Sequence, residues 1–178
     1  MKTIFCFFCM LIFSWVPQAS FGSDVGEEGF RTFVDSRGRF SIKYPATMSV
    51  ESPTPDELNI FHPSASLRIS LDIIKRPKKS SRDTKAFMEA IKRNLKEEFK
   101  DSTVLKEGNP SSDSSQQYLV CSFTDKRGVK LTQLTQVYLA DEHILQLMIT
   151  DRPEGFKNLM SVIDRISNSL RILKPSLD

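Results

Sequence analysis

The chain has 178 residues, of which 39% are hydrophobic and 26% charged; this composition and length suit one globular domain better than two. Its 25 Lys and Arg residues oppose 22 Asp and Glu residues, and the net charge of +3 is far below the basic excess of most nucleic-acid-binding domains. Seven Gly and nine Pro exclude collagen-like sequence, and 13 Phe argue against wholesale disorder. We therefore expect one packed domain and no nucleic-acid partner.

The first 22 residues have the pattern of a secretory signal peptide. A basic residue precedes an apolar run over residues 4–16, which Pro17 ends. As a helix rising about 1.5 Å per residue, this run spans roughly 20 Å, less than the roughly 30 Å hydrocarbon core of a membrane. Small residues three and one positions before the cut suit cleavage after Gly22. The sequence predicts a secreted or periplasmic protein with a flexible lead-in over residues 23–29; a retained anchor is the alternative.

Cleavage at this point leaves Cys121 as the one thiol of the mature chain. An intramolecular disulfide is then excluded, although exported proteins meet an oxidising compartment. Cys121 alternates in phase with Leu119 and Phe123. This pattern predicts a small, buried and unreactive side chain.

Strand patterns dominate the first part of the domain. Residues 30–34 and 40–44 flank a turn over residues 35–38 and predict a hairpin with an aromatic-rich buried face. Residues 58–61 predict a short strand, and the alternation over residues 67–73 predicts a strand with one face in solvent. Four aromatic side chains keep the strand period and are assigned to the core rather than to a ligand cage: Phe30, Phe33, Phe40 and Tyr44.

Two segments have helical spacing. Apolar residues four apart predict an amphipathic helix over residues 83–99, whose apolar stripe must cover a sheet. A second helix follows residues 151–154, which combine an acidic cap, a proline in the first turn and Glu three residues after the cap. Short strands are expected over residues 103–105 and 170–173.

Residues 117–124, 129–140 and 143–150 predict a three-stranded antiparallel meander with tight turns. In its middle strand the apolar phase shifts between Leu131 and Leu134, which suggests a β-bulge. Strands mixed with two helices, without a repeat or an internal linker, predict a single α+β domain over residues 30–174 with a tail at 175–178. Its two main helices are expected to pack on an antiparallel sheet.

Catalytic signatures are absent from the sequence. No stretch matches a Walker loop, a dinucleotide-binding glycine pattern, a zincin helix, a calcium loop or a nucleophile elbow. A catalytic triad would have to bring His62 or His143 to an unmarked Ser or to Cys121. Asp141, Glu142 and His143 share a tight turn on which side chains diverge, so we expect a solvated turn rather than a metal site. The sequence thus predicts no enzyme and no cofactor.

One charge cluster stands above the background. Six basic residues lie within eleven positions, opposed by Asp83 alone, and Pro77 keeps the segment out of regular structure. Such a run is often only a solvated loop. As a functional surface it would bind lipid headgroups, an acidic polymer or an acidic protein face. The residues of this candidate binding patch, called the basic patch below, are Lys75, Arg76, Lys78, Lys79, Arg82 and Lys85.

Residues 38–46, Gly-Arg-Phe-Ser-Ile-Lys-Tyr-Pro-Ala, resemble the opening of PsbP-like domains, because a turn glycine leads into an aromatic-alternating strand that stops at a proline. The order of elements over residues 30–173 is similar too, although Met48 stands where those domains tend to have Trp. The resemblance implies an α/β/α sandwich around a central antiparallel sheet. Members of this superfamily mostly bind partners and assist assemblies, without a shared binding motif, so no functional residue carries over.

These observations lead to three hypotheses about function, ranked by how well the sequence supports them. The leading one is an exported, non-catalytic envelope protein that binds or assists the assembly of a protein or anionic membrane-surface partner. The alternative is a carrier of a small hydrophobic ligand in a groove between helix and sheet. The least favoured is a hydrolase with an unmarked site.

Overall fold

A computed structural model describes residues 29–62, 65–76, 84–109, 115–140 and 142–173. Its elements in chain order are β1 (Phe30–Val34), β2 (Phe40–Pro45), β3 (Ser49–Glu51), β4 (Glu57–Phe61), β5 (Arg68–Lys75), α1 (Thr84–Glu98), β6 (Thr103–Gly108), β7 (Gln116–Thr124), β8 (Lys130–Leu139), β9 (His143–Asp151), α2 (Pro153–Asn158), α3 (Met160–Ser169) and β10 (Arg171–Ile172).

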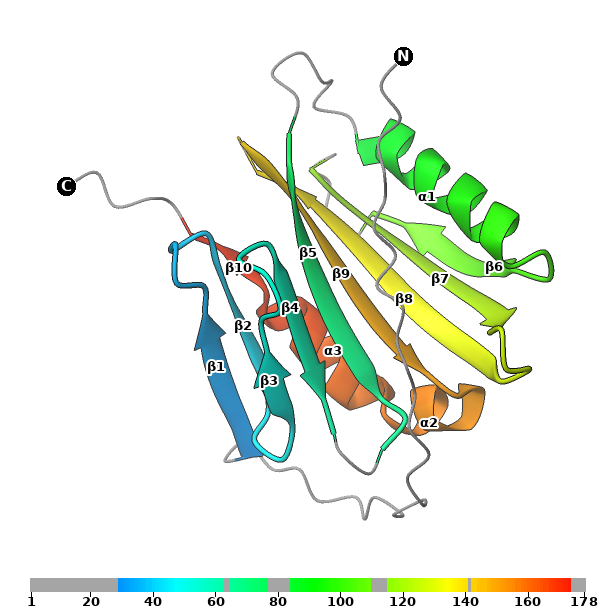
Figure 1. Cartoon of the computed structure of the whole chain (residues 1–178), viewed down its shortest axis with the longest axis horizontal. Helices are drawn as coiled ribbons and strands as arrows, with labels where there is room; N and C mark the ends of the chain where they lie inside the picture. The colour runs from blue at the N-terminus through cyan, green and yellow to red at the C-terminus, as the bar shows by residue number, and fades with distance from the viewer. Residues whose placement is uncertain (1–28, 63–64, 77–83, 110–114, 141, 174–178) are drawn as a thin grey trace.

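Seven antiparallel strands form the main sheet, in the order β3-β4-β5-β9-β8-β7-β6 (Figure 1). The meander β7-β8-β9 has the predicted boundaries to within one residue. β5 pairs with β9 over all eight of its residues, which joins the meander to the N-terminal strands. The predicted hairpin, β1-β2, takes the last strand β10 as a third member and forms a small sheet of its own. The sequence did not indicate this second sheet.

Two apolar clusters lie on opposite faces of the main sheet. On one face, α1 buries Met88, Ile91 and Leu95 against side chains of β7 and β8 such as Leu119 and Val137. On the other face, α2, α3 and the hairpin pack on a larger cluster from every strand between β4 and β8 in the sheet order. The predicted α+β class is therefore confirmed: helices cover both faces of a central antiparallel sheet, as in an α/β/α sandwich (Figure 1).

The β-bulge predicted in β8 is wrong. β8 pairs with β7 and with β9 without any register shift. The apolar phase changes because both faces of this central strand are covered. Leu131 and Val137 belong to the cluster under α1, whereas Leu134 and Tyr138 belong to the opposite cluster. A bulge occurs instead in β6, whose register with β7 shifts between Val104 and Lys106.

Other elements also differ from the prediction: β5 extends to Lys75, and β10 is limited to Arg171–Ile172. The single helix expected after Pro153 is two helices, α2 and α3, because the backbone of Leu159 leaves the regular helical range at φ −100° and ψ 15°. β3 was not predicted, since three residues carry too little pattern. β6 extends three residues beyond the predicted end, to Gly108, because an exposed edge strand has no apolar alternation to mark it.

The signal segment, the cleavage site after Gly22 and the tail at 175–178 lie outside the described residues, so these boundaries stay predictions. Among the residues that are described, no helix combines the length and apolarity needed to span a membrane. The longest, α1, has 15 residues and one polar side.

Candidate binding surface

The end of β5 carries the first two residues of the basic patch. Lys75 is exposed and lies directly opposite His143 of β9. The backbone N–H of Arg76 donates to the carbonyl of Glu142 at 2.9 Å, and its guanidinium donates to the carbonyl of Ala140 at 3.4 Å. The end of β5 is thereby fixed to the turn between β8 and β9.

The start of α1 carries the last residue of the basic patch. Lys85 is exposed in the first turn, beside the buried Thr84, and this turn contains no acidic residue. The positive end of the helix macrodipole therefore reinforces the charge of Lys85. Ile74 of β5 packs in the cluster under α1, and Figure 1 shows the end of β5 and the first turn of α1 at the same end of the molecule.

The fold thus brings Lys75, Arg76 and Lys85 to one end of the main sheet, although α1 begins nine positions after the end of β5. Lys78, Lys79 and Arg82 lie outside the described residues. His143 joins this end through strand pairing with Lys75, a neighbour that the linear charge run does not reveal.

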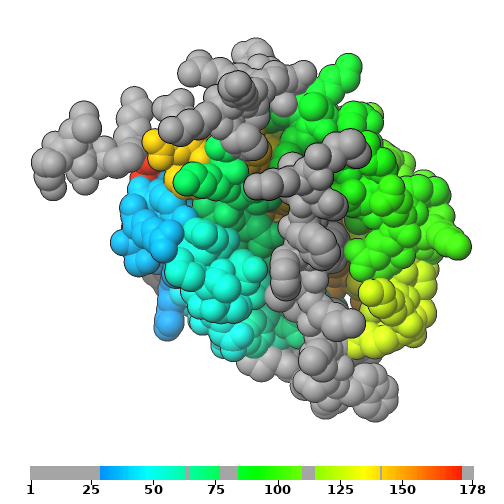
Figure 2. Space-filling model, turned by 45° about the horizontal axis from the view of Figure 1, so that its top comes forward, coloured from blue at the N-terminus to red at the C-terminus, as the bar shows by residue number. Residues whose placement is uncertain are grey.

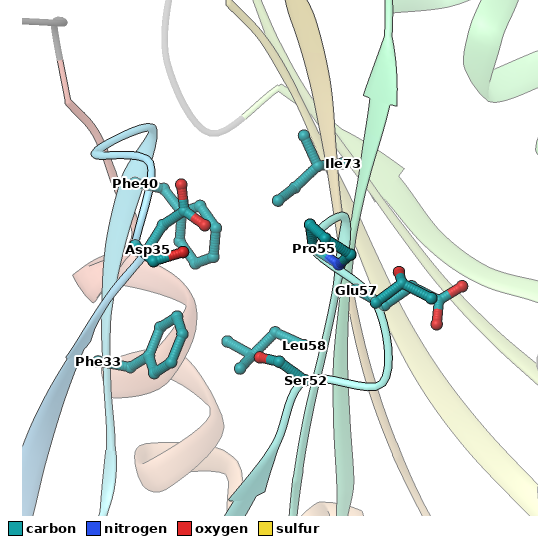
Figure 3. A pocket seen from close by; sticks show the side chains of 10 residues that line it. Phe33, Asp35, Phe40, Ser52, Pro55, Glu57, Leu58 and Ile73 are labelled. Atoms are coloured by element: carbon teal, nitrogen blue, oxygen red, sulfur yellow. The ribbon is translucent and has the colours of Figure 1, made fainter.

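A cavity lies between the hairpin and the main sheet (Figure 3). Phe33 and Phe40 of the hairpin point across it toward Leu58 and Ile73 of the main sheet. Its volume of about 50 Å³ suits one or two water molecules, whereas ligand pockets usually measure at least about 300 Å³. The cavity therefore does not support the carrier hypothesis.

The groove between helix and sheet that this hypothesis needs is filled with side chains. Met88 and Leu95 of α1 are 4% and 3% exposed, and Leu119 beneath them is fully buried. Phe99 stacks on Phe123 with 4.4 Å between the ring centroids. The carrier hypothesis finds no space at this interface.

A charged cluster that the sequence analysis missed closes one rim of the cavity. Arg39 donates through Nε and Nη2 to both carboxylate oxygens of Asp35, at 2.8 and 2.9 Å. It also donates through Nη1 to Asp56 at 2.6 Å and through Nη2 to the carbonyl of Pro55. We call this cluster the Arg39 latch, because it joins the hairpin turn to the loop before β4. Charges in a turn look like ordinary solvated turn residues, so no sequence pattern indicated this cluster.

Burial raises the pKa of the Asp35 carboxyl, but hydrogen bonds from the Arg39 side chain and from the Arg39 and Arg37 backbone N–H groups outweigh it. The net effect is a pKa below the ordinary value. The side chains of Asp35 and Arg39 are 7% and 12% exposed. The latch is consequently a structural ion pair, because Nε, Nη1 and Nη2 of Arg39 all donate to carboxylates of this chain.

A second missed pair consists of two carboxylates on neighbouring strands. Asp72 of β5 lies directly opposite Glu57 of β4 and directly opposite Gln146 of β9. Burial, and then the like charge of Glu57, raise the pKa of Asp72 to about 6. The alternation of β5 predicts that Asp72 lies on the solvent-exposed face of the strand. Its side chain is instead partly buried.

The expected burial of Cys121 is confirmed. Its side chain is 1% exposed and shares the cluster under α1 with Leu119 and Phe123. Burial raises the pKa of the thiol to about 11, and Sγ donates to the carbonyl of Gln133 at 3.8 Å. A neutral, enclosed thiol is not a nucleophile.

We predict that Cys121 resists thiol reagents in the folded protein. A pKa of about 11 instead of 9.0 lowers the thiolate fraction near pH 8 about a hundredfold, and burial blocks access as well. Labelling with iodoacetamide, followed by mass spectrometry of the peptide that contains Cys121, checks this. The same peptide should react quickly in denaturant; rapid labelling without denaturant would contradict the burial.

The two histidines lie at different ends of the sheet. His62 follows β4 next to the start of β5, whereas His143 faces Lys75 at its end. Seven strand positions between these ends correspond to about 23 Å. Ser66 donates to the buried Asp151, and burial raises the pKa of this carboxyl. The pair lies just before α2, where Asp151 also accepts a hydrogen bond from the Arg152 N–H at 2.7 Å. Within the described residues, no group of three or more His, Cys, Asp and Glu side chains is placed to hold a metal.

Comparisons with known proteins find this architecture among solved structures. No protein-family model and no curated protein sequence matches the chain. Solved structures do. The solution structure of cyanobacterial PsbP (CyanoP) from Synechocystis sp. PCC 6803 superposes with a TM-score of 0.65 at 11% identity, over 86% of this chain and 98% of that one. The Ran-binding protein Mog1p of Saccharomyces cerevisiae superposes with a TM-score of 0.63 at 10% identity, over 83% and 97% of the two chains.

The chain has the PsbP/Mog-type fold. This confirms the resemblance drawn from residues 38–46. LpqN, involved in cell envelope biogenesis of Mycobacterium tuberculosis, shares the architecture with a TM-score of 0.56 at 13% identity, over 82% of this chain and 91% of that one. At such identities the PsbP/Mog-type fold is shared, while binding residues are not transferable.

Proposed function

We propose that the protein is an exported, non-catalytic envelope protein that docks onto an anionic protein or membrane-surface partner through the basic patch. The observation that carries this proposal is the meeting of Lys75, Arg76 and Lys85 at one end of the main sheet, beside the positive end of α1. Two solved structures of the same fold support the proposal: Mog1p is described as Ran-binding, which supports a binding role, and LpqN as involved in cell envelope biogenesis, which supports an envelope role.

The export part of the proposal has its own test. N-terminal sequencing of protein recovered from the medium or the periplasm should find Ser23 as the first residue, because the apolar run over residues 4–16 is followed by a suitable cleavage site. Retention of Met1 in folded, soluble protein would contradict export.

For the docking part, we predict that reversing Lys75 and Lys85 to Glu weakens binding to vesicles containing anionic phosphatidylserine. Each basic residue near an anionic membrane contributes about 1 kcal/mol, so the loss should reach about 2 kcal/mol, or roughly thirtyfold, at low salt. Co-sedimentation over a range of salt concentrations measures it. Binding of the unmodified protein should fall steeply with salt, since exposed charges are screened over about 8 Å at physiological ionic strength.

The matched control reverses two exposed lysines elsewhere, Lys43 on β2 and Lys157 on α2, which gives the same change in net charge. This variant should keep most of the binding. Equal losses in both variants would show that only the net charge matters, and full binding by the Lys75 and Lys85 variant would show that the patch is merely solvated.

A further inference from the structure

β6 forms one edge of the main sheet. It pairs with β7 on one side, and no described strand pairs with its other side. Every residue of β6 except Gly108 is exposed. Figure 2 shows residues 84–108, in green, on one flank of the molecule. The backbone groups of such an edge are a template for a further strand.

The exposed edge is apolar at its centre. Val104 and Leu105 are 47% and 57% exposed, and Leu105 has the highest exposure of the large apolar side chains described. The bulge between Val104 and Lys106 leaves Leu105 without an opposite residue on β7. Two adjacent apolar side chains on an open edge are a liability that folded proteins usually cover or interrupt.

The opposite edge of the main sheet is protected in this way. β3 has only three residues, and the loop that follows it contains Pro53 and Pro55. Proline has no N–H to offer to an added strand. β6 has six residues against three in β3 and contains no proline, so more of its N–H groups can pair with an added strand, although the bulge and Lys106 interrupt its edge.

β6 is also held in its extended form. Lys92 of α1 forms ion pairs with Glu107 and, at 2.9 Å, with Glu89. Before the strand, Lys96 donates to the carbonyl of Lys100 at 2.7 Å, and the Thr124 N–H donates to Asp101 at 3.2 Å. A strand fixed at both ends loses little conformational entropy when it pairs.

We propose that β6 pairs antiparallel with β6 of a second copy of this chain, about a two-fold axis perpendicular to the sheet. In this register Val104 of each copy lies opposite Leu105 of the other, and Thr103 lies opposite Lys106; the register requires Val104 and Leu105 to share a face, which the bulge at Leu105 allows because two consecutive residues of β6 there oppose one residue of β7. The four exposed apolar side chains then meet at the centre and hydroxyls meet charged groups at the rim. Such self-complementarity is what a two-fold interface requires, because each copy presents the same patch.

The helices leave room for this arrangement. α1 contacts β7 and β8 and is tied to β6 through Glu107, so the two copies of α1 lie on the same face of the joined sheet. Three strand spacings separate β7 of one copy from β7 of the other, or about 14 Å. Packed helices approach to about 8–10 Å, so the two α1 helices do not collide.

Sedimentation velocity on the purified protein over a wide concentration range tests this pairing. The pairing of six residues is a small interface, so we expect a monomer that converts to a dimer as concentration rises. Leu105→Lys should remain monomeric over the whole range. The control Val34→Lys changes an equally exposed side chain, 56% exposed on the small sheet, and should dimerise like the unmodified protein. Thermal unfolding verifies that both variants are folded.

The register has a separate readout. When Val104→Cys and Leu105→Cys variants are mixed under mild oxidation, mass spectrometry should find a disulfide between position 104 of one copy and 105 of the other. A protein that is monomeric at every concentration overturns the proposal and leaves the edge open to another partner. A dimer that persists in Leu105→Lys also overturns it, because it must use another surface.

Discussion

Replacing Arg39 with Met should destabilise the protein by about 3 kcal/mol. The substitution removes a cation that bonds both oxygens of Asp35, and it leaves that carboxylate nearly buried without its partner. Breaking a buried ion pair from one side costs roughly this much, since the remaining charge is desolvated and unpaired. For a domain of this size, the midpoint of thermal unfolding should fall by about 6–12 °C, as measured by circular dichroism.

The pH dependence of this deficit identifies its cause. The pKa of Asp35 is lowered in the folded protein, so the group stabilises folding above its ordinary value of 3.8 and loses that contribution as the pH falls through the folded value. In Arg39→Met only burial and the backbone N–H groups act on the carboxyl, and its protonation relieves the unpaired charge. The deficit should therefore shrink below about pH 4.

Arg37→Met is the matched control for the latch. Arg37 is half exposed and reaches Asp56 only at 3.4 Å, so its loss should change stability by less than about 1 kcal/mol. A similar cost for both variants would mean that general turn charge, rather than the contact between Arg39 and Asp35, holds the hairpin.

Asp72→Asn should stabilise the protein at neutral pH by about 2 kcal/mol. The pKa of Asp72 is about 6 in the folded protein against an ordinary 3.8, and a difference of this size corresponds to at most about 3 kcal/mol. Because the folded pKa of this acid is raised, its ionisation opposes folding. Stability of the unmodified protein should fall as the pH rises from about 4 to about 6, and the variant should lack this fall.

Urea unfolding at pH 4 and pH 7.5 measures both the stability gain of Asp72→Asn and the pH dependence of the unmodified protein. The unmodified protein and Asp72→Asn should differ at pH 7.5 and agree at pH 4, where Asp72 is protonated. Asp164→Asn removes the same charge from an exposed position on α3 and should change stability by less than about 0.5 kcal/mol at either pH. No gain in Asp72→Asn at pH 7.5 would show that Asp72 is well solvated.

Most strands and α1 were predictable because their faces differ in polarity. Leu67, Ile69 and Leu71 alternate with polar residues, and one apolar cluster buries them. β8 lacks this contrast, since every residue from 131 to 138 is buried, so its pattern looked like an irregularity. Periodicity reports one covered face and fails where a strand is covered on both.

The candidate site was predictable only in part. The basic patch was visible because its charges lie within eleven positions of the sequence, and three of its six residues lie in the described parts of the chain. His143 beside Lys75, Asp72 opposite Glu57, and Arg39 against Asp56 depend on pairing between segments distant in sequence. Strand register decides such neighbours, and a single sequence carries no direct signal for it.

The small sheet joins the two ends of the domain, since β2 lies between β1 and the last strand, β10. The Lys43 N–H donates to Ser169 Oγ at 2.8 Å across 126 residues, and the Leu173 N–H donates to the carbonyl of Arg39 at 2.9 Å. During synthesis, the hairpin therefore emerges first and waits for almost the whole chain before its third strand exists. The small sheet is completed only after residues 171–172 have been made, so the fold of the domain closes late in its synthesis.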